Sequence, residues 1–154
     1  MIDRPQITQT VAQLTAFIHL TVPREDIGKV MGPGLSEVRA AIAAQGIAAD
    51  GPWFTHHLRM DPQIFDFEIC VPVAMPIDAA GRVQPGQWPP TTVARTVYHG
   101  PYEGLGAAWR EFDAWVASKG YGPRPDLWEC YVEGPETSSD SSSWRTELNR
   151  PLVD

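Results

Sequence analysis

Apolar and polar residues alternate along residues 13–22, and a period of two predicts a β-strand. Over residues 24–45 the apolar side chains instead recur every three or four positions, which predicts an amphipathic helix. A Gly-Pro-Gly sequence that begins at Gly32 is expected to kink this helix or to divide it in two. Strand-like segments follow over residues 53–60 and 65–75, so the first half reads as strand, helix, strand, strand.

The second half repeats this order after a segment rich in proline. Residues 76–90 contain few large apolar groups, and we expect them to form a connecting loop. Beyond this loop the pattern predicts a strand over residues 91–99, a helix over 102–119, and two strands over 127–132 and 144–152. The two halves therefore have the same predicted order of elements.

A short motif also recurs at matching places in the two halves, which indicates an internal duplication. Residues 68–73 read Glu-Ile-Cys-Val-Pro-Val and residues 147–152 read Glu-Leu-Asn-Arg-Pro-Leu. We therefore predict an α+β fold of one domain, residues 1–154, with repeat one at about 12–75, a linker at 76–90 and repeat two at about 91–153. Each helix would cover one face of its sheet, and the two remaining faces would enclose a ligand cleft.

Charge and composition limit the classes of partner. The chain has 154 residues and a formal net charge of -7, so it has no basic surplus for nucleic acid or anionic membranes, and we expect neither as a direct partner. The 6 Trp, 4 Tyr and 5 Phe supply surface on which flat ligands stack. The 2 Cys lack the spacing of a zinc site, and we predict no metal and no cofactor. The sequence shows neither a leader pattern nor an apolar run of membrane-spanning length, so we predict a cytoplasmic location.

Three glutamates are candidates for a shared cavity. Side chains alternate across a strand, so Glu129 and Tyr131 share one face of the predicted strand 127–132, while the apolar residues beside them share the other. We expect the apolar side to face the helix, which directs Glu129 and Tyr131 into the cleft. The same argument places Glu68 and Glu147 on the cleft side of their strands.

A carboxylate among aromatic walls is costly unless it is paired, so a bound organic cation would satisfy these glutamates. The alternative interpretation is structural. In that case each glutamate lies in water at a strand end or pairs with an arginine such as Arg59, Arg145 or Arg150. Spacing alone leaves both interpretations open.

Three motifs in the second half point to a known family. They are Tyr98-His99-Gly100-Pro101-Tyr102, Trp128-Glu129-Cys130-Tyr131 and Trp144-Arg145-Thr146-Glu147-Leu148-Asn149-Arg150-Pro151-Leu152. Together they resemble the GyrI-like family of small-molecule-binding domains, which is also the effector-binding domain of many AraC-type and MerR-type regulators. The resemblance covers nearly the whole chain, and it implies two SHS2-like β-α-β-β units with pseudo-twofold symmetry and a ligand cleft between the repeats.

The resemblance also implies site residues. The family's acidic pocket residue falls on Glu129, with Tyr131 two positions along as in the motif. Glu147 lies in the last motif, and Glu68 is its repeat mate. Trp109, on the predicted helix, is expected in the core. The aromatic walls of the pocket are expected to come from Tyr98, Tyr131, Trp53 and Trp144.

We predict a pocket for flat, lipophilic, often cationic compounds, used in sensing, sequestering or detoxifying xenobiotics. We expect this binding domain to stand alone, because the first predicted strand leaves no room for a preceding helix-turn-helix segment. The alternative is an enzyme, since some relatives hydrolyse electrophilic cyclopropane-bearing DNA-alkylating compounds. Glu129 would then activate or orient water while Tyr98 or Tyr131 donates a hydrogen bond to the substrate carbonyl. A third interpretation is protein interaction, as in the family branch named for inhibition of DNA gyrase.

Overall fold

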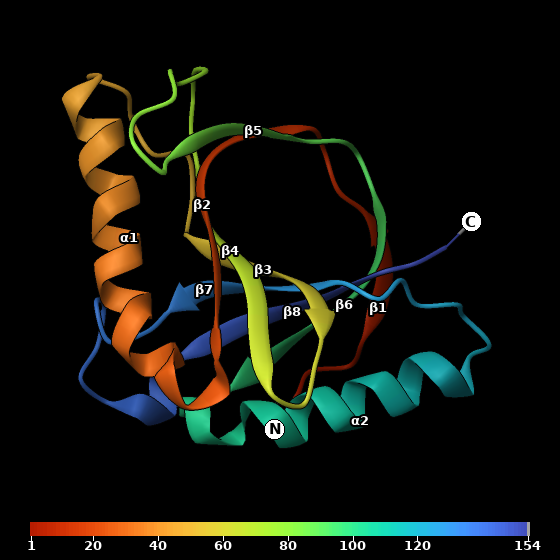
Figure 1. The fold of residues 1–154 in the computed structure, drawn as a ribbon. Coiled ribbons are helices and arrows are strands. Elements are labelled where there is room, and N and C mark those ends of the chain that lie inside the picture. The colour runs from red at the N-terminus through yellow and green to blue at the C-terminus, as the bar shows by residue number, and fades with distance from the viewer. Residues whose placement is uncertain (154) are drawn as a thin grey trace. The chain divides into compact units, whose positions relative to one another are not determined.

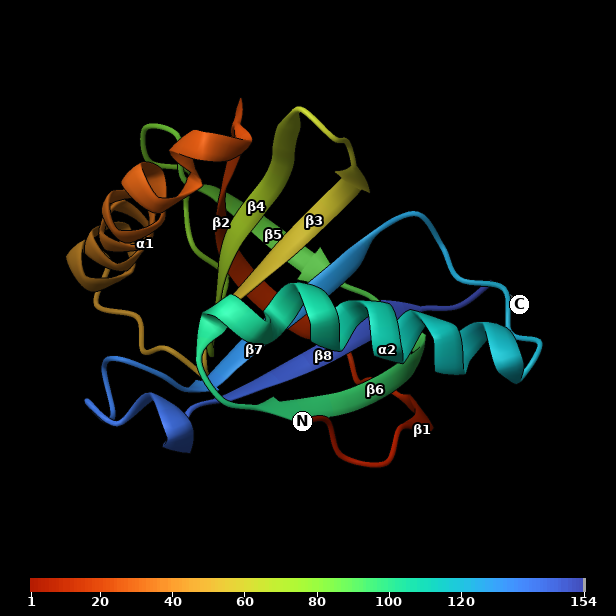
Figure 2. The same cartoon turned by 90° about the horizontal axis from the view of Figure 1, so that it is seen from below.

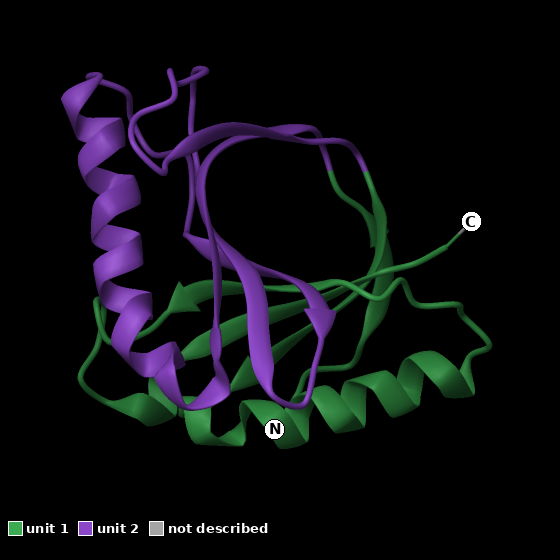
Figure 3. Cartoon of the chain, viewed as in Figure 1, with its two compact units in different colours: residues 1–10, 91–154 green, residues 11–90 purple. Residues whose placement is uncertain are grey.

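The computed structural model describes residues 1–153, and the chain forms two compact units (Figure 3). One unit contains residues 11–90 and holds repeat one. The other contains residues 1–10 together with the chain from residue 91 onward, and it holds repeat two. The last residue of the predicted domain, Asp154, lies outside the described residues.

Repeat one is an antiparallel sheet with one helix (Figure 1). Its strands are arranged in the order β3-β4-β2-β5. Helix α1 packs on one face of this sheet, because its apolar stripe meets the inward-facing residues of β2 and β4. The elements are β2 (Gln13–Pro23), η1 (Arg24–Asp26), α1 (Ile27–Ala44), β3 (Phe54–Met60), β4 (Ile64–Pro72) and β5 (Gln84–Trp88).

Helix α1 continues through its Gly-Pro-Gly sequence, so the division into two helices does not occur. Gly34 explains why small residues stand at this place. A Cβ atom on Gly34 would lie 2.6 Å from Cδ1 of Ile69 on β4, which is closer than real side chains approach. Glycine therefore allows α1 to lie close against the sheet, and the sequence feature serves packing.

Repeat two has the same construction. Its strands are arranged in the order β7-β8-β6-β1, and Figure 2 shows α2 lying across this sheet. Its core contains Phe112 and Val116 of α2, packed against Ala94 and Leu148 of the sheet. The elements are β1 (Gln6–Gln9), β6 (Thr92–His99), η2 (Tyr102–Gly104), α2 (Leu105–Ser118), β7 (Leu127–Glu133), η3 (Ser141–Ser143) and β8 (Arg145–Pro151).

The α+β class and the duplicated β-α-β-β unit are confirmed. In both repeats the strand before the helix pairs with the last strand, which in turn pairs with the strand after the helix. Both sheets even carry an irregularity at the equivalent place, between His57 and Arg59 in β3 and between Tyr131 and Glu133 in β7. Equivalent positions of the two repeats can therefore be compared residue by residue.

The structure adds one strand to each repeat. Strand β1 precedes repeat one along the chain, yet it pairs with β6 of repeat two. Strand β5 lies within the segment 76–90 that was predicted as a loop, precedes repeat two, and pairs with β2 of repeat one. Gln9 lies opposite Thr92 and Gln87 opposite the equivalent Leu14, so the two added strands have matching registers. The repeats have thus exchanged their leading strands.

None of the helices among residues 1–153 combines the length and the apolarity needed to cross a membrane.

Candidate functional site

Glu129 of β7 is a buried acid, with 9% of its surface exposed. Its Oε2 accepts a hydrogen bond of 2.6 Å from Nε1 of Trp109 on α2, and its Oε1 accepts one of 2.8 Å from the hydroxyl of Tyr131. Burial raises the pKa of the Glu129 carboxyl, although the two hydrogen bonds act in the opposite direction. Among residues 1–153, no basic side chain forms an ion pair with Glu129. The described chain therefore provides no counterion for an ionised Glu129.

Aromatic rings continue outward from this carboxyl. The ring centroids of Tyr131 and Tyr102 lie 5.9 Å apart, and those of Tyr102 and Trp144 lie 4.9 Å apart. Nε1 of Trp144 donates a hydrogen bond of 2.9 Å to the carbonyl oxygen of Ser138, which fixes the indole against the loop before β8. Burial, followed by the charges of Glu129 and a second glutamate, raises the pKa of the Tyr102 phenol. Tyr102 is therefore held as a neutral phenol at neutral pH.

A buried hydroxyl lies on the same face of the sheet. Thr146 of β8 is directly opposite Tyr131, and two residues further on Leu148 belongs to the core beneath α2. The Oγ1 atom of Thr146 is buried and has no hydrogen-bond partner among residues 1–153. We call this set the Glu129 site, and its members are Tyr102, Trp109, Glu129, Tyr131, Trp144 and Thr146.

The structure reverses the predicted faces of β7. Glu129 lies opposite Leu148 and bonds to α2, so it faces the helix, whereas the sequence analysis directed it away from the helix. The reason is that Trp128, on the face away from the helix, is also buried. Apolar character therefore does not identify the helix side of this strand. The bulge after Tyr131 leaves the apolar Val132 exposed as well.

Glu147 lies on the face of the sheet away from α2, so it lies on the opposite face from Glu129, although the sequence analysis placed the two glutamates on the same side. Its Oε1 is 3.4 Å from Nε of Arg95 and accepts a hydrogen bond of 3.2 Å from Asn149. Cys130 is its cross-strand neighbour, and burial together with the Glu147 charge raises the pKa of the Cys130 thiol to about 12. Glu147 is thus an acid already paired within its own repeat, and Cys130 is a poor nucleophile.

Glu68 and Trp53 belong to repeat one. Oε1 of Glu68 lies 3.0 Å from Nδ1 of His56 on the neighbouring strand, and the His56 ring packs edge-on against Trp88. Trp53 packs against the core on the helix side of that sheet. Glu68 and Trp53 therefore have these contacts within the unit that holds repeat one, whereas the Glu129 site belongs to the other unit.

Tyr98 has a structural partner. Its hydroxyl donates a hydrogen bond of 2.8 Å to the carbonyl oxygen of Pro101, and the ring is buried in the core of repeat two. A Cβ atom on Gly104 would lie 2.0 Å from the Tyr98 hydroxyl oxygen, so the turn into α2 requires glycine at this place. Tyr98 thus braces the turn that positions Tyr102.

The sequence analysis missed Tyr102 and Thr146 as site residues and expected Trp109 in the core alone. The signal for Tyr102 was present in the Gly-Pro-Tyr motif, whose tyrosine follows the turn directly. Trp109 packs against the core and also bonds to Glu129, and helical periodicity reports only the first role. Thr146 has no sequence signal, because its importance depends on burial without a partner.

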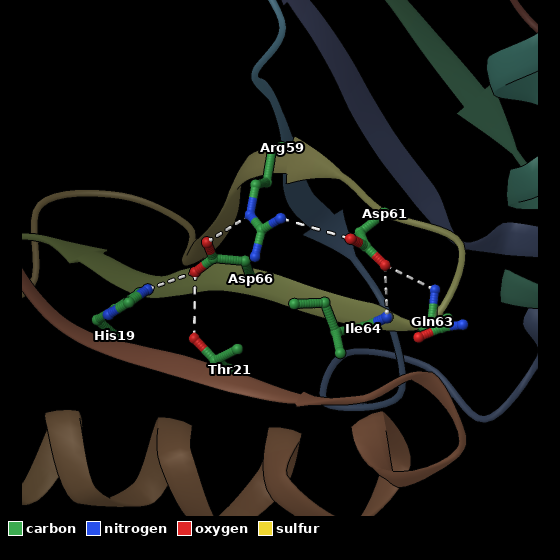
Figure 4. Close-up of polar contacts among 7 residues, drawn as sticks. All are labelled: His19, Thr21, Arg59, Asp61, Gln63, Ile64 and Asp66. Carbon is green, nitrogen blue, oxygen red and sulfur yellow. Dashed lines mark hydrogen bonds and ion pairs between the residues drawn. The ribbon is translucent and has the colours of Figure 1, made fainter.

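A second polar cluster lies at one end of the repeat-one sheet (Figure 4). Asp66 accepts hydrogen bonds from Thr21 and Arg59 and contacts His19, while Asp61 accepts bonds from Arg59 and from two backbone amides. These bonds hold the pKa values of both carboxyls below their usual range. The cluster is internally satisfied and braces the turn between β3 and β4. Within residues 1–153, no group of three or more His, Cys, Asp or Glu side chains is placed to hold a metal ion.

Comparison with known proteins identifies relatives at the level of family and fold. A sequence model of the GyrI-like small molecule binding domain matches residues 5–152. No curated protein sequence matches the chain. The C-terminal domain of EcmrR is 21% identical over 98% of both chains, with a TM-score of 0.87. In the EcmrR complex with DNA, the match has a TM-score of 0.88 at 20% identity and covers 98% of this chain but 57% of the EcmrR chain.

Two further solved structures share the fold. SAV2435 bound to tetraphenylphosphonium is 12% identical, with 98% of this chain and 94% of that chain covered and a TM-score of 0.71. A hydrolase encoded by lin2189 from Listeria innocua is 10% identical, with 97% and 92% covered and a TM-score of 0.69. At these identities the likeness shows a common fold.

Proposed function

Because the chain belongs to the GyrI-like family of small-molecule-binding domains, we propose that the Glu129 site binds flat, lipophilic, cationic compounds. The observation that carries this proposal is a buried carboxyl that two neutral donors hold in place and no basic residue among 1–153 neutralises. A cationic guest would supply the missing charge. The neighbour bound to tetraphenylphosphonium supports the lipophilic and cationic character of the proposed ligand.

The aromatic members of the site suit the same guest. A cation over an aromatic face contributes about 0.5 to 2 kcal/mol, with the larger values in desolvated places. Tyr102, Tyr131 and Trp144 form a continuous series of rings that begins at the Glu129 carboxyl. Stacking would hold the flat body of the ligand while the carboxylate holds its charge.

The biological role that follows is the sensing, sequestration or detoxification of such compounds. Neither Cys70 nor Cys130 forms a disulfide within residues 1–153, which suits a reducing compartment, so we place this activity in the cytoplasm. The direct partner in this proposal is the small molecule.

The test compares two glutamates of the same repeat. Glu129→Gln keeps the shape and removes the charge, and we expect it to weaken binding of a cationic aromatic dye at least about tenfold, as measured by calorimetry. Binding of a neutral dye of the same shape should change much less. Glu147→Gln is the control, because Glu147 lies on the other face and already pairs with Arg95. Equal losses for the two dyes in Glu129→Gln would contradict the charge role.

Hydrolysis of an electrophilic cyclopropane is the second candidate, favoured by the raised pKa of Glu129 and its bond from Tyr131. Glu129 would take a proton from water while the water oxygen bonds to a ring carbon. The breaking carbon–carbon bond would send its electron pair toward the substrate carbonyl, where the phenol of Tyr102 donates a hydrogen bond and the proton is returned. The lin2189 hydrolase has the same fold, which makes the chemistry worth testing.

The expected product of this reaction is the substrate plus one water, detected by mass spectrometry. Glu129→Gln should abolish its formation, and Glu147→Gln should leave it unchanged. Formation at the same rate in Glu129→Gln and in the unaltered protein would exclude this mechanism.

A further inference from the structure

Among residues 1–153, two buried side-chain hydroxyls have no hydrogen-bond partner, that of Thr15 in repeat one and that of Thr146 in the core of repeat two beside Glu129. Thr146 is 0% exposed, lies between Tyr98 and Tyr131 on the neighbouring strands, and its Oγ1 has no hydrogen-bond partner among residues 1–153. A buried hydroxyl without a partner lowers stability, because it has lost its bonds to water. Such a group is retained at a cost unless something else bonds to it.

Repeat one shows that the fold does not need this hydroxyl. Phe67 lies opposite Leu20 in repeat one, just as Thr146 lies opposite Tyr98 in repeat two. Phe67 is fully buried, and its ring stacks on His57, the counterpart of Tyr131. The same backbone position therefore accepts a large apolar ring. Repeat two instead has a smaller side chain with a polar atom there.

The hydroxyl hydrogens of the two neighbouring tyrosines already form hydrogen bonds. The Tyr131 hydroxyl donates to Glu129, and the Tyr98 hydroxyl donates to Pro101. Each carboxylate oxygen of Glu129 accepts one of these hydrogen bonds, and a carboxylate oxygen can accept about two. The Glu129 carboxylate and the Thr146 oxygen can therefore both still accept a hydrogen bond.

We infer that the guest of the Glu129 site is a primary or secondary ammonium group on a flat aromatic body. One N–H would donate to the Glu129 carboxylate and another to Oγ1 of Thr146. The two residues are diagonal neighbours on one face of an antiparallel pair, a spacing of roughly 7 to 8 Å between backbones that their side chains and one ammonium can bridge. A quaternary cation has no N–H and would leave the Thr146 hydroxyl without a partner.

This inference rests on the proposed function and restricts it, because it separates amines from other lipophilic cations. The bond from a charged N–H to a buried oxygen is stronger than one between neutral groups. The amine should therefore bind more tightly than a permanently charged analogue of the same body.

The experiment uses naphthylmethylammonium and its trimethylammonium analogue as matched probes in calorimetry with the full chain. We expect the unaltered protein to prefer the primary amine by about tenfold or more. Thr146→Val, which keeps the shape and removes the hydroxyl, should reduce this preference by about tenfold through weaker amine binding alone. Thr55→Val, which alters a buried threonine of repeat one, should leave the binding of both probes unchanged.

The outcomes separate the two levels of the proposal. If both probes bind equally and Thr146→Val changes neither, the amine inference is overturned, whereas cation binding at Glu129 stands. If neither probe binds, or if both bind Glu129→Gln as well as the unaltered protein, the proposed function is overturned as well. A urea unfolding midpoint for Thr146→Val no lower than that of the unaltered protein would show that the variant is folded and that the hydroxyl does not serve stability.

Discussion

The two repeats build opposite environments at equivalent positions of the same fold. Repeat two has Glu129 and Tyr131 on β7, joined by a hydrogen bond of 2.8 Å. Repeat one has Thr55 and His57 at these places on β3, with Oγ1 of Thr55 lying 3.3 Å from Nε2 of His57. The acid and phenol of one repeat are thus replaced by a hydroxyl and an imidazole in the other.

The side chains around these two positions also differ between the repeats. In repeat one the His57 ring stacks on Phe67 with centroids 5.4 Å apart, and the Arg24 guanidinium lies 4.3 Å from the Phe65 centroid. Burial, followed by the charges of His56 and Arg24, lowers the pKa of His57 to about 4, so its ring is neutral near pH 7. In repeat one, the rings of His57 and Phe67 therefore occupy the equivalent positions, and Arg24 places a positive charge beside Phe65.

This comparison teaches that the candidate site depends on side chains and not on the fold as such. Both repeats have the same strand order and the same bulge, yet only repeat two combines a buried acid with an unpartnered hydroxyl among the described residues. Duplication gives two equivalent positions. Substitution then allows one of them to serve stability while the other takes the binding role that we propose.

The largest expected effect comes from giving repeat one the threonine of repeat two. Phe67→Thr removes a fully buried ring that stacks on His57, and we expect a loss of about 3 to 5 kcal/mol in the free energy of unfolding, measured with urea. Thr146→Val is the matched change in repeat two and should alter stability by less than about 1 kcal/mol. Similar losses in both variants would show that the two positions are equivalent after all.

A smaller effect is expected from the imidazole of repeat one as the pH falls. The pKa of His57 is about 4 in the folded chain against 6.5 as its ordinary value, so the unfolded chain binds a proton that the folded chain does not. Stability should therefore decrease between pH 6.5 and about 4, by up to roughly 3 kcal/mol at the lower end. Unfolding by urea at several pH values measures this slope, and His57→Phe should flatten it.

The control for the pH experiment is His99→Gln. His99 lies on the surface beside Asp3, so its removal should leave most of the slope between pH 6.5 and about 4 in place. If His57→Phe and the unaltered protein have the same slope, the neutral buried imidazole is not the source of the pH dependence.

The regular elements of the fold were predictable because each carries a strong local pattern. The predicted strand 13–22 and helix 24–45 correspond closely to β2 and to η1 followed by α1. Strands β1 and β5 were missed because they are short and polar, and β5 contains Pro85 and Gly86. Their pairing uses backbone groups of partners distant in sequence, which leaves no periodic pattern of apolar side chains.

The site was only partly predictable for a related reason. Glu129, Tyr131 and Trp144 were named from motifs, and the structure brings them together through hydrogen bonds and ring contacts with Tyr102. The direction of Glu129 was wrong because both faces of β7 carry buried residues. The role of Thr146 depends on the hydrogen bonds it does not make, which only coordinates reveal.

The exchange of leading strands makes the two halves of the chain dependent on each other during folding. Strand β1 precedes repeat one along the chain, yet its partner β6 follows repeat one, so β1 has no strand to pair with until β6 has been synthesised. A lone repeat that kept its own leading strand would reproduce this pairing only by trading that strand with a second copy. The pairing therefore has the connectivity of a strand-swapped dimer whose two copies were fused into one polypeptide.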